Sequence, residues 1–195
     1  DCGNLEKLDI SSFDFGKVSS KESMFEGCVN LEELDLSKVD LSNTQYDVHG
    51  LVEECTGLKT IHTPKAMAEY QDIALPGVFM DAEGNYTVEI TSEWCGKTLT
   101  KAPDNISTGT VYMNNELRWV YDELTKTLTV TGKATGRLGS VGDERTYSFF
   151  TLISEDIEKV IMKDCIISNG SAMFADMKKL QSVTFENVDT SKAND

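Results

Sequence analysis

The sequence predicts an α/β repeat fold built from short stacked coils, in two segments separated by β-hairpins. Two observations carry this prediction. The first is that residues 28–43, CVNLEELDLSKVDLSN, echo the opening of the chain, DCGNLEKLDISSFDFGK. The second is that further copies of the pattern return at intervals of 23 to 27 residues. Such a fixed interval is the sequence signature of a repeat architecture.

The copies share one apolar position that we expect to face a common core. The third copy starts at Cys55, and the fourth and fifth occupy residues 157–165 and 173–192. In the five copies this position is filled by Leu8, Leu34, Ile61, Val160 and Val183. Because one copy cannot bury its own apolar face, we expect these side chains to take equivalent inward positions on stacked parallel strands.

Each coil is predicted to contain a strand, a turn and a short helix. In LEELDL, the apolar Leu34 and Leu36 alternate with acidic residues, which is the period of a half-buried strand. The polar stretch SKVDLSN that follows predicts a surface turn, with Val39 pointing inward. The segment before each cysteine predicts a short helix, and Ser19 with Glu22 has the spacing of a capping box.

The period and the motif resemble a known family. The interval lies in the 20–29 range of leucine-rich repeats, whose strand signature is L-x-x-L-x-[IL]. The pattern M-F-x-x-C-x-x-L-x-x-L-D-L-S-x-x-D-x-S-N at residues 24–43 resembles the BspA-like leucine-rich repeats of bacterial surface proteins. Residues 2–14, 55–61 and 173–191 match it in part, with Met177 in place of cysteine. The resemblance implies a leucine-rich-repeat solenoid of parallel strands, turns and short helices, outside a bacterial cell.

The repeat is interrupted between about residues 66 and 117. LPGVFMDAEGNYTVEI, at residues 75–90, predicts a β-hairpin around a turn rich in Asp, Gly and Asn. A second hairpin is expected over residues 117–131, with its turn at DELTK. We therefore expect a first repeat segment at residues 1–77, a hairpin cap and linker at 78–115, a hairpin opening the second segment at 116–136, and a second repeat segment at 137–195.

Composition excludes some partners and leaves the cysteines with two interpretations. The formal net charge is −15 over 195 residues, which disfavours nucleic acid and anionic membranes as partners. No apolar run approaches the length that membrane insertion requires. Cys2, Cys28 and Cys55 stand at repeat spacing, and we expect them to fill the core as small apolar residues. A disulfide between neighbouring coils is the alternative.

Known catalytic and metal-binding motifs are missing from the sequence. His49 and His62 form no H-E-x-x-H pair, and there is no G-x-S-x-G elbow. The glycine-rich TGKATGRLG at residues 131–139 matches no phosphate-binding loop, and DAEGN at 81–85 lacks the ligand frame of a calcium loop. We therefore expect no enzymatic activity, no cofactor and no metal site.

One row of side chains is a candidate partner-binding face. Residues flanking the inward strand position point away from the core. They are Lys7, Asp9, Glu33, Asp35, Thr60 and His62 in the first segment, with Ile161 and Thr184 in the second. Adjacent carboxylates in such a row attract a basic side chain or a cation, whereas the simpler interpretation is a solvated acidic face. The loops around Asp14 and Asp40 are the second candidate location.

Three functions compete. The first is a non-enzymatic bacterial cell-surface interaction or adhesion module, secreted or on the cell surface, that binds a protein or glycan on a host or neighbouring cell. The second is a structural spacer in a larger envelope protein. An enzyme ranks third, because the repeat accounts for most of the chain.

Overall fold

The computed structural model describes residues 2–10, 13–15, 18, 20–42, 48–111, 115–141 and 146–193. It divides the chain into two compact units, Asp1–Pro103 and Asp104–Asp195. Each unit has its own cluster of buried hydrophobic residues, the first extending to Leu99 and the second starting at Val111. Ser19, half of the expected capping box, lies outside the described residues. No helix in the described ranges is long and apolar enough to cross a membrane.

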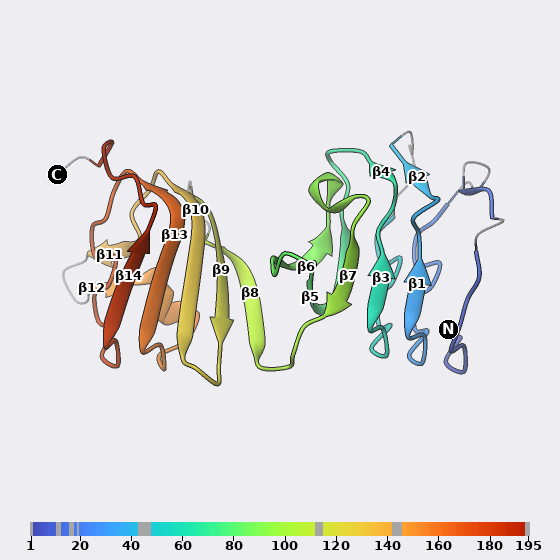
Figure 1. The fold of residues 1–195 in the computed structure, drawn as a ribbon, viewed down its shortest axis with the longest axis horizontal. Helices are drawn as coiled ribbons and strands as arrows, with labels where there is room; N and C mark the ends of the chain where they lie inside the picture. Colours follow the sequence, from blue (N-terminus) through green and yellow to red (C-terminus); the bar gives the residue numbers. More distant parts are fainter. Residues whose placement is uncertain are drawn as a thin grey trace. The chain divides into compact units, whose positions relative to one another are not determined.

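The first unit is built on a five-stranded sheet with the order β1-β3-β7-β5-β6 (Figure 1). Its strands are β1 (Glu33–Asp35), β3 (Thr60–His62), β5 (Ile73–Met80), β6 (Tyr86–Ile90) and β7 (Thr98–Lys101). β1 and β3 are parallel, whereas the remaining neighbours are antiparallel. A small parallel pair, β2 (Asp40–Leu41) and β4 (Ala66–Met67), and the 3₁₀ helix η2 (Ser92–Trp94) complete its described regular structure.

The second unit is built on another five-stranded sheet, with the order β14-β13-β10-β9-β8 (Figure 1). Its strands are β8 (Ile106–Val111), β9 (Asn115–Asp122), β10 (Thr127–Ala134), β13 (Lys159–Ile167) and β14 (Ser182–Glu186). β10, β13 and β14 are parallel, and β9 and β8 continue the sheet in antiparallel fashion. The antiparallel pair β11 (Gly139–Val141) and β12 (Thr146–Ser148) and the 3₁₀ helix η3 (Phe149–Leu152) lie in the same unit.

The strand register follows the repeat alignment. Leu34 is the Cα partner of Ile61, and Val160 is the partner of Val183. Both hairpins are also present, as β5–β6 and as β9–β10. The predicted interruption of the parallel strands is therefore confirmed, as is the register at these positions.

The predicted fold class is wrong. The described residues contain no α-helix, and the strands lie in mixed sheets, so the chain is not an α/β leucine-rich-repeat solenoid. Only two strands of the first main sheet and three of the second are parallel to one another. The hairpin strands do not cap a continuous parallel stack from outside. In the second sheet the hairpin strand β10 pairs directly with the repeat strand β13, and in the first sheet β7 joins the hairpin strand β5 to the repeat strand β3.

Backbone conformation explains why no helices form before the cysteines. Left-handed residues recur four positions apart in these segments, in the pairs Ser23 and Gly27, Gly50 and Glu54, and Ala172 and Asp176. An α-helix requires negative φ throughout. The chain instead passes through consecutive turns, in which the N–H of Met24 bonds the carbonyl of Lys21 and that of Glu26 bonds the carbonyl of Ser23.

These turns are stabilised by neighbouring turns rather than by internal helical bonds. The N–H groups of Ser23, Phe25 and Gly27 donate to the carbonyls of His49, Leu51 and Glu53, one repeat later. Because no helix forms here, these backbone groups make their hydrogen bonds between repeats instead, as buried backbone groups must. Cys28 and Cys55 are buried in this region as expected, whereas Cys2 is exposed. All five thiols are free, so the disulfide alternative is not observed.

Candidate partner-binding face of the first unit

The candidate face is the solvent-facing side of β1, β3 and β7. Leu34, Ile61 and Leu99 point inward from these strands and are fully buried. Their neighbours therefore point outward, because successive side chains of a strand alternate between its two faces. We call this surface the acidic strand face, formed by Lys7, Asp9, Glu33, Asp35, Thr60, His62, Thr98 and Thr100.

His62 lies at the centre of the acidic strand face. Its Nε2 lies 3.1 Å from Oε1 of Glu33 on β1, and its Nδ1 lies 2.9 Å from Oγ1 of Thr98 on β7. One ring nitrogen of a neutral imidazole donates while the other accepts, so these two contacts fix the ring between two strands. The imidazole is half-buried, while the Glu33 carboxylate remains exposed to solvent.

Asp35 carries a second exposed carboxylate on this face, opposite His62 in the strand register. Its Oδ1 accepts the backbone N–H of Ser37 at 2.8 Å. Hydrogen bonds from the side chain and backbone of Ser37 hold the pKa of Asp35 below its usual value, and His62 adds a smaller electrostatic contribution. The carboxylate is therefore ionised at neutral pH and available to a cationic group.

A buried network behind the face positions β7 against β3. Thr63, which follows His62, is fully buried, and its hydroxyl accepts the N–H of Lys97 at 2.8 Å. The same hydroxyl lies 2.7 Å from the carbonyl oxygen of Trp94 and 2.9 Å from that of Lys97. Because Thr98 directly follows Lys97, these hydrogen bonds of the Thr63 hydroxyl place the Thr98 hydroxyl beside the His62 ring.

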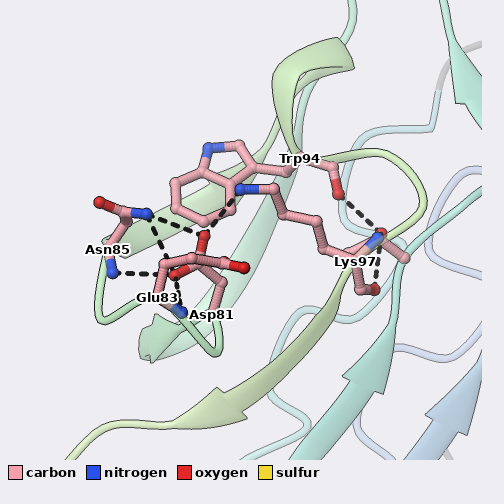
Figure 2. Close-up of polar contacts among 6 residues, drawn as sticks. Asp81, Glu83, Asn85, Trp94 and Lys97 are labelled. Atoms are coloured by element: carbon pink, nitrogen blue, oxygen red, sulfur yellow. Dashed lines mark hydrogen bonds and ion pairs between the residues drawn. The ribbon is translucent and has the colours of Figure 1, made fainter.

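An ion pair ties the same loop to the β5–β6 turn, as Figure 2 shows. Nζ of Lys97 lies 2.7 Å from Oδ2 of Asp81 and 4.9 Å from the centroid of the Trp94 ring. The buried Asp81 carboxylate also accepts the N–H groups of Glu83 and Asn85. DAEGN is thus a hairpin turn, as predicted, and the Asp81 oxygens are occupied by these internal donors.

The structure brings most of the predicted site residues together and separates two of them. A parallel bridge joins Lys7 to Glu33, and Thr60 and His62 pair with Glu33 and Asp35. Asp9, two residues after Lys7, is exposed on the same strand segment. Ile161 and Thr184 are partners in the second unit, on the outward side of β13 and β14, and do not belong to this face. Asp40 is engaged in a turn with Ser42.

Sequence reasoning missed Thr98 and Thr100. The alternating stretch TLTK, at residues 98–101, was a signal for a half-exposed strand. Its place beside β3 was not visible in the sequence, because 35 residues lie between His62 and Thr98 and the intervening hairpin pairs on the far side of β7. The hydrogen bonds of the Thr63 hydroxyl and the ion pair of Asp81 with Lys97 were missed for the same reason.

Two further features bear on chemistry. In the described part of the chain, no group of three or more His, Cys, Asp or Glu residues is arranged to hold a metal ion. The second unit has a cleft of about 130 Å³ lined by Thr151, Glu155, Asp156, Asp176, Lys178 and Lys179. Four of its charged side chains pair with one another, since Lys179 pairs with Asp156 and Lys178 with Asp176.

Comparisons of the chain with models of protein families, with curated proteins and with solved structures found no match. The resemblance to BspA-like proteins therefore stays a prediction from the motif, and the site must be interpreted from its own geometry.

Proposed function

We propose that the chain is a non-enzymatic interaction module whose acidic strand face binds a basic protein surface. The observation that carries this proposal is the arrangement around His62 on β3, in which Glu33 and Asp35 of β1 present two carboxylates and Thr98 of β7 presents a hydroxyl. Residues two apart on a strand point to the same face about 6.6 Å from one another, so one Lys or Arg side chain reaches both carboxylates.

A protein partner accounts for this face better than a glycan does. Protein recognition sites commonly use complementary charge, and exposed carboxylates favour Lys and Arg on the partner. Sugars bind through hydroxyl contacts and through stacking on aromatic rings. The acidic strand face as defined offers three carboxylates, hydroxyls, an imidazole and the ammonium of Lys7, but no Tyr, Trp or Phe. We place the encounter outside a bacterial cell, on the strength of the motif resemblance alone.

The test is a charge reversal on the face. Asp9→Lys with Asp35→Lys is assayed against the partner recovered by pull-down from bacterial or host surface extracts. We expect the double variant to lose at least tenfold in affinity, and wild-type affinity to fall as salt screens the carboxylates. A gentler variant, Asp35→Asn, keeps the acceptor for the Ser37 N–H and removes only the charge.

A matched control separates the face from overall charge. Asp104→Lys with Glu123→Lys changes the net charge by the same amount at exposed positions of the second unit. This control should bind like the wild type. Equal loss in both double variants would mean that net charge alone attracts the partner, and unchanged affinity of the Asp9/Asp35 variant would contradict the proposed face. A chain that recovers no partner would favour the spacer function.

A further inference from the structure

Three side chains at the centre of the acidic strand face form a continuous chain of hydrogen bonds. Oγ1 of Thr98 lies 2.9 Å from Nδ1 of His62, and Nε2 of the same ring lies 3.1 Å from Oε1 of Glu33. The hydroxyl, the imidazole and the carboxylate come from β7, β3 and β1, which are neighbours in one sheet. A hydroxyl, an imidazole and a carboxylate linked in this order are the arrangement that activates a serine or threonine as a nucleophile.

The pairing of the strands brings these side chains together. His62 and Thr98 are direct Cα partners on antiparallel strands, so their side chains lie on the same face with Cβ atoms about 4.5–5.5 Å apart. Glu33 is the partner of Thr60, two residues before His62, and its longer side chain reaches the ring from this diagonal position. Thr98 is exposed on the solvent side of the sheet, so a small molecule in solution can contact its hydroxyl.

The carboxylate of Glu33 determines where the hydrogen atoms of this chain lie. An ionised carboxylate only accepts hydrogen bonds, so Nε2 of His62 carries the hydrogen that is donated to Glu33. In the neutral imidazole Nδ1 then has a lone pair, which accepts the hydroxyl hydrogen of Thr98. The imidazole is therefore placed to take the proton that the hydroxyl loses when its oxygen attacks an electrophile.

We propose that Thr98 is an acylation site, which accepts an acyl group from an activated ester or thioester with His62 as the base. Oγ1 attacks the carbonyl carbon of the donor, and the bond from that carbon to the leaving oxygen or sulfur breaks. The Thr98 proton passes to Nδ1 and from there to the leaving group, so the products are an acylated threonine and a free alcohol or thiol. Glu33 is a positioning residue, because it fixes the tautomer of the imidazole and stabilises the imidazolium that forms during the attack.

Acylation of Thr98 modifies the chain itself and is separate from the proposed binding of a basic partner. It requires the Thr98 hydroxyl, whereas partner binding relies on the carboxylates of the acidic strand face. Acylation is measured with a small ester and without any partner protein, so either proposal can fail while the other stands.

The probe is p-nitrophenyl acetate, which releases coloured nitrophenolate when its acetyl group is transferred. The full 195-residue chain is mixed with the ester at neutral pH, quenched early with acid, digested and analysed by tandem mass spectrometry. We expect the acetyl group on Thr98 and not on Thr100, which is exposed on the same face two residues later. No acetyl group on Thr98, or equal acetylation of the two threonines, would overturn the proposal.

Substitutions test the role of each of the three side chains. Thr98→Val keeps the β-branched shape and should abolish the acetylated threonine. His62→Gln should slow acetylation of Thr98 at least tenfold, because a positioned base typically contributes a factor of about 10²–10⁴. Glu33→Gln keeps an acceptor oxygen but removes the charge, and should slow the reaction by a smaller factor. Thr98→Ser, whose primary hydroxyl is less hindered, should be acetylated faster than the wild type.

The pH dependence distinguishes a base from a merely structural histidine. The charged groups that face the ring are Glu33 and Asp35 on β1, while the outward residues of β7 are the uncharged Thr98 and Thr100. The rate of acetylation should rise between about pH 5 and 8, because neutral imidazole replaces imidazolium over this range. His62→Gln should lose this rise, and a variant that kept it would overturn the role of His62.

Two control variants exclude a general reactivity of surface hydroxyl and imidazole groups. Thr110→Val replaces an exposed threonine of β8, and His49→Gln replaces the other histidine of the chain, which is also exposed. Both controls should be acetylated on Thr98 at the wild-type rate. A loss in His49→Gln equal to that in His62→Gln, or a His62→Gln variant that reacts like the wild type, would overturn the proposal.

Discussion

Asp81 is a buried carboxylate of the first unit that is surrounded by hydrogen-bond donors. Its side chain is 1% exposed. Burial by itself raises the pKa, but hydrogen bonds from Lys97 and Asn85 outweigh burial and bring the pKa of Asp81 well below its usual value of 3.8. A group with a lower pKa in the folded than in the unfolded state stabilises the fold in its ionised form.

Replacing Asp81 by Asn should destabilise the first unit by about 1–3 kcal/mol, because the neutral amide has one acceptor oxygen instead of two and cannot form an ion pair with the Lys97 ammonium. In the wild type the contribution is fully present above pH 3.8 and is lost as the pH falls further towards the folded pKa. Urea unfolding of both proteins at pH 7 and at a series of acidic values measures this. The difference in unfolding free energy between the wild type and the variant should shrink in acid. A difference independent of pH would contradict the ion-pair explanation.

Leu34 is the inward residue of β1 and has no exposed surface. Leu34→Ala removes a side chain from a packed core and should cost about 2–5 kcal/mol of unfolding free energy. Leu124→Ala, at a leucine that is 79% exposed, is the control and should change stability by less than about 0.5 kcal/mol. Urea melts of the two variants check the pair. Equal stability would place Leu34 outside the core and refute the strand register.

At the scale of elements, Gly132 interrupts the pairing of β10 with β13. The register shifts between Thr131 and Gly132, and Gly132 has a φ of +103°, which L side chains rarely adopt. A Cβ at this position would stand 2.3 Å from the carbonyl oxygen of Glu116 on β9. The extra residue of this bulge is Asp164 on β13, and on the other side of β10 the backbones of Gly132 and Glu116 approach too closely for any side chain.

Gly132→Ala should therefore destabilise the second unit by more than Gly84→Ala destabilises the first. Both glycines have positive φ, but a Cβ on Gly84, which has a φ of +82°, meets no atom within 4 Å. The Gly84 variant is destabilised only by backbone strain, about 1 kcal/mol, whereas the Gly132 variant suffers the same strain and also a clash with the backbone of β9. Thermal melting followed by the intrinsic fluorescence of each unit compares them, and an equal loss in both would mean that β9 moves aside freely.

At the scale of the whole molecule, the two units have separate sheets and separate cores. We expect fragments 1–103 and 104–195 to fold when each is expressed alone, because each carries its own buried cluster. Dispersed amide resonances in each fragment, matching those of the full chain, would be the expected result. A fragment with the narrow dispersion of an unfolded chain would show that its core depends on the other unit.

Much of the local structure was accessible from the sequence. The alternation in LEELDL and the repeat spacing placed Leu34, Ile61, Val160 and Val183 correctly, since side-chain direction in a strand depends only on neighbouring residues. The turn at DAEGN was equally local. The short helices were predicted wrongly. Ser23 and Glu54 adopt a left-handed backbone conformation although neither is a glycine, which is the usual sequence signal for such a turn.

The repeat register, the two hairpins and the outward row that contains Glu33, Asp35 and His62 follow from the amino-acid sequence alone. The tertiary structure decided which strands lie side by side. It inserted β7 between β3 and β5, which brought Thr98 to His62 and Lys97 to Asp81. The physical reason is that alternation fixes which face of a strand is buried, whereas the choice of neighbour depends on which sheet edge is free and which pairing closes the core.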